Sequence, residues 1–218
     1  MGLRRFLRSL PGPKTTPIPM CDGYNAQFAE SWRREERAMI AVESLPRMSV
    51  SDYLAFERES EIRHELVDGY LYAMTGASDR HEEIAANLLA ALHQHLHGSG
   101  CRVYGSNLKI RVGDDFLYPD LFVRCAAERG DSYFKTDPKL VVEVLSPNTQ
   151  RYDRGDKRLA YQSLPSLQEY VLVAQDEPSI EIYRRTEDGW QVTRHRGPDT
   201  SIELSCIDLV IRLDRIYA

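Results

Sequence analysis

The sequence lacks any long apolar run, which limits where the protein can reside. Across its 218 residues, no hydrophobic stretch approaches the roughly 20 residues that a membrane-spanning helix requires. The basic start, Met1–Arg8, is followed by no apolar core long enough for a secretory signal. We therefore expect a cytoplasmic protein with no membrane among its partners.

Cysteine is scarce, and its spacing excludes the common metal-binding and redox motifs. The four cysteines are Cys21, Cys101, Cys125 and Cys206, and no two of them form a Cys-x-x-Cys pair. Scattered cysteines are typical of a reducing compartment, in which thiols stay free. We therefore expect free thiols rather than a disulfide framework.

Positive charge is not in excess either. The formal net charge of −5 argues against broad electrostatic coating of nucleic acid, although a local basic groove remains compatible with it. Hydrophobic residues make up 42% of the chain and charged residues 28%, which are values typical of a globular protein with a core. A chain of this length predicts one domain with an extension.

The extension is expected at residues 1–47. Closely spaced prolines interrupt regular structure there, and arginines are frequent. Residues 29–43 could form a short amphipathic helix, but we expect the segment as a whole to be disordered or weakly ordered. The folded domain is expected over residues 48–218, and the natural start could be Met1 or Met48.

Helical and strand patterns follow one another along residues 48–218. The expected elements are a short helix from Ser51, a hairpin over 65–74, a helix over 78–97, strands at 103–112, 116–124 and 139–146, a helix over 153–163, a strand at 169–173 and a hairpin over 180–194. This order predicts a mixed α/β fold with one central sheet.

The apolar and β-branched residues at 139–146 predict a strand that is buried on both faces. Alternation places Glu143 on one face between Val141 and Leu145. An unpaired buried carboxylate costs several kcal/mol or becomes protonated. We therefore expect a metal, a lysine or an arginine to hold Glu143.

Further polar residues surround this strand in the sequence. Asp120 lies in the preceding strand, and two carboxylates on neighbouring strands suit a hard divalent cation. On the helix that follows, Asp153, Lys157 and Tyr161 recur at four-residue spacing and so share one face. Carboxylates that hold Mg²⁺ and a lysine that neutralises charge are what phosphodiester hydrolysis requires.

Several motifs in this order resemble those of a known family. They are Glu65-Leu66-Val67-Asp68-Gly69, His81, Tyr118-Pro119-Asp120-Leu121, Val142-Glu143-Val144-Leu145-Ser146-Pro147, Asp153…Lys157…Tyr161 and Glu169-Tyr170. The pattern, over about residues 48–210, is similar to the Uma family (domain of unknown function 820) of the PD-(D/E)xK nuclease superfamily. The resemblance implies a restriction-endonuclease-like core, in which helices flank a central mixed sheet.

The resemblance also implies functional residues. Asp120 and Glu143 would bind Mg²⁺ or Mn²⁺, and Glu65 would be an outer third ligand. The superfamily's lysine two residues after the glutamate is Leu145 here, and the similar family supplies it from the following helix, which matches Lys157.

The leading hypothesis is therefore a metal-dependent nuclease that acts on DNA. The expected catalytic residues are Asp120, Glu143, Lys157 and Glu65, and the expected nucleic-acid contacts are Arg151, Arg154, Arg158 and His81. A homodimer is possible by family analogy only. The alternative is a catalytically inactive module that keeps the nuclease fold and binds nucleic acid or another partner.

Each of these residues also has a structural interpretation. Asp120 could end a strand in solvent, and Lys157 could simply pair with Asp153 on the helix surface. Glu65 could be a cap or form a salt bridge with Arg63 or Lys157, and His81 could position a phosphate or Glu65 or be a structural histidine. Sequence alone leaves these alternatives open.

Overall fold

The structure is a computed structural model that describes residues 47–147 and 149–218. The helix expected over 29–43 lies outside these residues. The first described helix, α2 (Val50–Glu59), begins just before the expected Ser51 because Ser49 caps it by accepting a hydrogen bond from the Asp52 amide at 3.2 Å. No helix in the described part of the chain is long and apolar enough to cross a membrane.

The largest sheet has six strands in the order β11-β10-β9-β8-β6-β3. Their bounds are β3 (Arg102–Gly105), β6 (Leu121–Arg124), β8 (Leu140–Leu145), β9 (Glu169–Ala174), β10 (Ser179–Thr186) and β11 (Gly189–Arg196). Strands β8 and β9 run parallel, and the other neighbouring pairs run antiparallel. The expected mixed central sheet is therefore confirmed.

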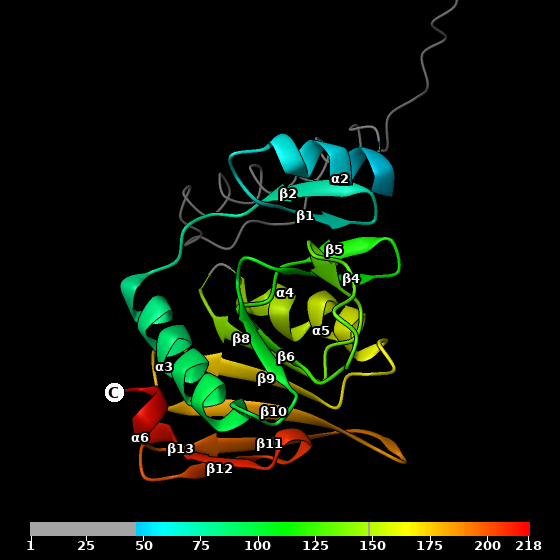
Figure 1. Ribbon diagram of the computed structural model, residues 1–218. Helices are drawn as coiled ribbons and strands as arrows, with labels where there is room; N and C mark the ends of the chain where they lie inside the picture. The colour runs from blue at the N-terminus through cyan, green and yellow to red at the C-terminus, as the bar shows by residue number, and fades with distance from the viewer. Residues whose placement is uncertain (1–46, 148) are drawn as a thin grey trace, which may run out of the picture. The chain divides into compact units, whose positions relative to one another are not determined.

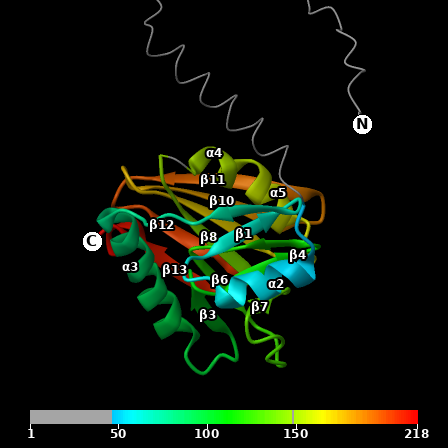
Figure 2. The same ribbon diagram turned by 90° about the horizontal axis from the view of Figure 1, so that it is seen from above.

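Helices cover both faces of this sheet, as Figures 1 and 2 show. The side chains of Leu140, Val142 and Val144 pack against α3 (Asp79–Leu96). On the opposite face, Val141 and Leu145 share a core with residues of α5 (Asp156–Gln162). The predicted alternation of β8 and the three-layer arrangement both hold, because each face of the strand meets its own helix layer.

The expectation of a single sheet is wrong. A second sheet has the order β2-β1-β5-β4-β7, and α2 packs on it through Tyr53. Its strands are β1 (His64–Val67), β2 (Tyr70–Ala73), β4 (Lys109–Val112), β5 (Asp115–Leu117) and β7 (Phe134–Lys135). The predicted hairpin is confirmed: Asp68 and Gly69 both have positive φ, at 51° and 82°, as a tight turn between two strands requires.

The two-sheet arrangement also corrects two predicted strands. The strand expected at 103–112 is divided into β3 and β4, and the strand expected at 116–124 is divided into β5 and β6. In each case one half joins the five-stranded sheet and the other half joins the six-stranded sheet. Apolar periodicity does not reveal such a crossing, because both halves are apolar strands.

The helix expected over 153–163 is also divided. Helix α4 (Gln150–Arg154) begins earlier than predicted, and Gly155 separates it from α5. A Cβ atom at Gly155 would lie 3.0 Å from the carbonyl oxygen of Arg151, so a side chain at this position would crowd the main chain of α4. The C-terminal elements were not predicted from sequence: β12 (Ser201–Leu204), η1 (Ser205–Ile207), β13 (Leu209–Arg212) and α6 (Leu213–Ile216).

The expectation of free thiols is wrong for two cysteines. Cys101 and Cys125 form a disulfide. They adjoin the directly opposed pair Arg102 and Arg124 of the antiparallel strands β3 and β6, so strand register brings them together. Spacing along the chain contained no sign of this pairing. Cys206 is a free thiol, and Cys21 lies outside the described residues.

Helix α3 offers a direct test of the core. Leu92 is fully buried in the cluster between α3 and the six-stranded sheet. Replacing it (Leu92→Ala) should lower the free energy of unfolding by about 2–5 kcal/mol, because a cavity remains. Leu89→Ala on the exposed side of the same helix should change it by less than about 0.5 kcal/mol in urea unfolding. Equal effects would contradict the observed orientation of α3.

Candidate active site

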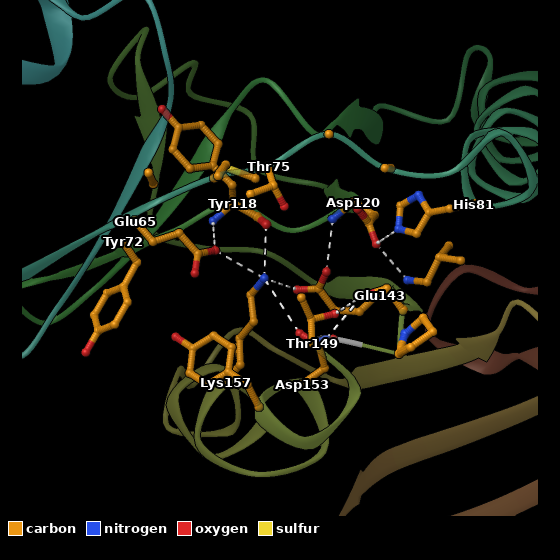
Figure 3. Close-up of a pocket in the computed structure, with 18 of the residues that line it drawn as sticks. Glu65, Tyr72, Thr75, His81, Tyr118, Asp120, Glu143, Thr149, Asp153 and Lys157 are labelled. Carbon is orange, nitrogen blue, oxygen red and sulfur yellow. Dashed lines mark hydrogen bonds and ion pairs between the residues drawn. The ribbon is translucent and has the colours of Figure 1, made fainter. Parts of the chain in front are cut away.

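A cavity of about 660 Å³ opens where the two sheets meet the helices. Its wall includes β1, the segment from Tyr72 to Ser78, the residues around Asp120 and Glu143, and the first turns of α4 and α5. Four of the predicted residues, Glu65, Asp120, Glu143 and Lys157, line this one cavity although they are up to 92 positions apart in the sequence. Figure 3 shows them pointing toward one another.

Asp120 and Glu143 are held together by reciprocal hydrogen bonds. The Asp120 amide donates to Glu143 Oε2 at 3.1 Å, and the Val144 amide donates to Asp120 Oδ2 at 2.7 Å. Asp120 directly precedes β6, and β6 pairs with β8, which carries Glu143. Glu143 is therefore fixed by the main chain just before β6 and Asp120 by the main chain of β8, so the two acids lie side by side.

Lys157 lies at the centre of the carboxylates. Its Nζ is 3.0 Å from Glu143 Oε1, 3.2 Å from Glu65 Oε1 and 4.0 Å from Asp153 Oδ1. It also donates a hydrogen bond to the carbonyl oxygen of Tyr118 at 3.1 Å. The prediction that a cation would hold Glu143 is thus confirmed, and Lys157 does more than form a surface pair with Asp153 (Figure 3).

Glu65 forms a salt bridge with Lys157, which is one of the structural roles that the sequence left open for it. Its Oε1 also accepts a hydrogen bond from the Tyr118 amide at 2.8 Å. Tyr118 belongs to the short segment that leaves β5 in one sheet and reaches β6 in the other. Through its amide and its carbonyl oxygen, Tyr118 therefore fixes both members of the Glu65–Lys157 pair.

Burial and charge shift the pKa values of this cluster strongly. Burial raises the pKa of Glu143 well above its ordinary value, and the charge of Lys157 only partly offsets this. Burial alone would lower the pKa of Lys157, but the carboxylates of Glu143 and Glu65 outweigh burial and hold it well above the ordinary value. The ion pairs with Glu143 and Glu65 thus favour the charged form of Lys157.

His81 contacts Asp120 and not Glu65. Its Nε2 lies 3.2 Å from Asp120 Oδ2, and its amide is capped by Ser78 Oγ at 3.2 Å in the first turn of α3. The hydrogen bond with Asp120 raises the pKa of His81 in spite of burial. His81 Nδ1 is buried and has no hydrogen-bond partner among the described residues. Its predicted contact with nucleic acid stays a prediction.

Leu145 occupies the core, as a leucine should. It is 5% exposed and packs with Tyr161 and Tyr170. Leu145 lies on the same face of β8 as Glu143, so a lysine at this position would approach the carboxylates from the strand. In this chain the cation near Glu143 comes from α5 instead: it is the ammonium group of Lys157, a residue that is 6% exposed.

The donor set suits a hard divalent cation in part. Glu143 Oε1 is buried and receives no hydrogen bond within the described residues, although it is ion-paired with Lys157. Asp120 and Glu143 thus offer two carboxylates with oxygen atoms to spare. In residues 47–147 and 149–218, no three His, Cys, Asp or Glu side chains are close enough to ligate one ion. One or two carboxylates with water and substrate oxygens is a common arrangement for Mg²⁺.

The three arginines that we predicted to contact nucleic acid do not line the cavity. Arg154 pairs with Glu181 of β10, and Arg158 donates to Gln162 Oε1 at 2.9 Å with its guanidinium over the Tyr183 ring. Arg151 is exposed on α4. The structure thus separates these side chains from Lys157, and their role stays a prediction.

Sequence reasoning missed part of the cavity wall. Asp153 was noted as a helix partner of Lys157, but its position in the carboxylate cluster was not predicted. Tyr72 and Tyr152 also line the cavity and were not assigned there. The four-residue spacing between Asp153 and Lys157 was the signal that could have indicated the position of Asp153. No sequence pattern indicated that Tyr72 and Tyr152 line the cavity.

Comparisons with known proteins show which family this chain resembles. The family model "Uma2: Putative restriction endonuclease" matches residues 50–214. Uncharacterized protein slr1290 of Synechocystis sp. is 38% identical over 176 residues, which cover 79% of this chain and 92% of that protein. Uncharacterized protein sll1609 of the same organism is 26% identical over 173 residues, or 77% of this chain and 98% of that protein.

A solved structure shows the same fold. It is the crystal structure of a "putative nuclease" of domain of unknown function 820 from Anabaena variabilis, with a TM-score of 0.66. At 17% identity, the similarity covers 78% of this chain and 97% of that one. Since the family model spans most of the chain and the fold agrees, this chain belongs to the Uma2 family of restriction-endonuclease-like proteins.

Proposed function

We propose that the protein is a divalent-metal-dependent nuclease that hydrolyses phosphodiester bonds in DNA. The observation that carries the proposal is the side-by-side pair of Asp120 and Glu143, which line a cavity beside the buried cation Lys157. Membership of the Uma2 family supports a nucleic-acid substrate. The metal and the choice of DNA are parts of the proposal.

Each residue has a specific role in this proposal. Asp120 and Glu143 would hold Mg²⁺ or Mn²⁺ through their carboxylates. The ion, when bound, polarises a phosphoryl oxygen and lowers the pKa of bound water. Lys157 keeps its positive charge and steadies the negative charge that develops on the phosphate. Glu65 holds Lys157 in place at 3.2 Å, so it acts through the lysine and stays only a predicted outer ligand.

A second candidate is an inactive nucleic-acid-binding module with the same fold. The existing contacts of Lys157 favour this inactive module, because four oxygen atoms already lie within 4.0 Å of its ammonium group. An active enzyme must let a phosphate or a water compete for one of these contacts. A cleavage assay of the parent protein and Glu143→Gln separates the two candidates.

Metal binding can be tested without a substrate. Asp120→Asn keeps the shape of the side chain but removes its charge, so Mn²⁺ affinity by isothermal titration should fall at least about 10- to 100-fold. Asp188→Asn, in the exposed β10–β11 turn, is the control and should bind like the parent. Equal affinities in all three proteins would remove Asp120 from the metal site.

Catalysis is tested by Glu143→Gln. This variant should lose at least about 100-fold in the rate of Mg²⁺-dependent DNA cleavage, the scale for losing one electrostatic catalytic group. Circular dichroism should show an unchanged fold, since glutamine has the same shape. Glu187→Gln, at the exposed hairpin turn, is the matched control. Cleavage that survives Glu143→Gln would contradict the proposed mechanism, and cleavage by none of the proteins would favour the inactive module.

The predicted contacts between arginines and DNA phosphates can be tested by the salt dependence of DNA binding. Arg151 is exposed, so its removal (Arg151→Ala) should reduce the slope of log K against log salt concentration for DNA binding by about 0.9, one phosphate contact. Arg102→Ala, at the exposed start of β3, should leave the slope unchanged. If both variants keep the parent slope, Arg151 does not contact the backbone.

A further inference from the structure

The cavity is poor in groups that neutralise phosphates. Six carboxylate side chains line it, namely Glu65, Asp68, Asp120, Glu143, Asp153 and Asp156. Among the described lining residues, the side chains that carry or can take a positive charge are His81 and Lys157, and both are already paired with carboxylates. A polyanion needs several cations along its path. The part of a DNA substrate that enters this cavity should therefore carry few phosphates.

Two carboxylates of the cavity wall are almost fully buried, whereas the side chain of Asp120 is 20% exposed. Glu143 is 3% exposed and Glu65 is 8% exposed, so a substrate reaches them only by entering the cavity. The volume of about 660 Å³ falls in the range of roughly 300–1,000 Å³ that is typical of small-molecule sites. A mononucleotide unit is of that size, whereas a base-paired duplex with two backbones is much larger.

An aromatic wall lies beside the carboxylates. Tyr72 of β2 is directly opposite Glu65 in the β1–β2 register, so both side chains are on the same face of that sheet. Tyr72 is 46% exposed, and Figure 3 shows its ring next to Glu65 at the cavity. Tyr152 of α4 lines the same cavity. Aromatic rings at such positions are used as stacking surfaces for unpaired bases.

We infer that this cavity receives one unpaired nucleotide of a DNA strand, with its base against Tyr72 and its phosphate at the Asp120–Glu143 pair. The inference rests on the proposed function and specifies its substrate as single-stranded or locally unpaired DNA. A base that is removed from its stack presents a neutral aromatic surface to the acidic cavity and a single phosphate to the metal site. Enzymes that do chemistry on a base likewise extrude one nucleotide from a duplex into a pocket.

The experiment compares a single-stranded oligonucleotide with the fully paired duplex of the same sequence. Both Mg²⁺-dependent cleavage and binding by fluorescence anisotropy are measured for the parent, Tyr72→Ala, Tyr72→Phe and the control Tyr133→Ala. Tyr133 is 62% exposed and does not line the cavity. The parent should prefer the single strand, and Tyr72→Ala should weaken its binding about 5- to 150-fold, the effect of losing one base-stacking contact. Tyr72→Phe keeps the ring and should behave like the parent, as should Tyr133→Ala.

The outcomes separate this inference from the proposed function. Cleavage in which the duplex is an equal or better substrate, with no effect of Tyr72→Ala, overturns the inference and leaves the nuclease proposal intact. Single-strand binding that depends on Tyr72 but is accompanied by no cleavage supports the inference and contradicts catalysis. A protein that neither binds nor cleaves either probe overturns both. A loss that is equal for Tyr72→Ala and Tyr72→Phe would also overturn the stacking role.

Discussion

The buried ammonium group of Lys157 is the interaction on which the site depends. It lies within 4.0 Å of carboxylate oxygens of Glu65, Glu143 and Asp153, which come from two strands and a helix. Without it, these carboxylates would be buried beside one another with no permanent cation among them. The cost of such burial is several kcal/mol for each ion, so the charge of Lys157 offsets the burial of the carboxylates around it.

Main-chain hydrogen bonds fix the orientation of the carboxylates in this cluster. Hydrogen bonds from backbone amides orient Asp120, Glu143 and Glu65, and these amides belong to β8 and to the segment between β5 and β6. That segment passes from one sheet to the other. The cavity thus exists because two sheets meet there, and its acidic groups are fixed by strand ends rather than by flexible loops.

Much of the fold was predictable where the local pattern was strong. Ser78 and the apolar spacing after it predicted α3, and Asp68-Gly69 predicted the β1–β2 turn. The alternation around Glu143 predicted which face of β8 it shares with Leu145. The divided strands and the disulfide of Cys101 and Cys125 were missed, because each depends on contacts between segments that are far apart in the sequence. The break at Gly155 is local, and it was missed because a single glycine within a helical pattern does not by itself predict the end of a helix.

The sequence by itself determined the types of residue at the site and the need to neutralise Glu143, because a carboxylate in an apolar strand requires a partner wherever that strand lies. Only the tertiary structure decided that this partner is Lys157 and that Glu65 and Asp153 share it with Glu143. The register of β6 on β8 aligned Asp120 with Glu143, and packing of α5 directed Lys157 inward while Arg154 and Arg158 turned toward β10. Such choices depend on three-dimensional distances, which the spacing along the chain does not contain.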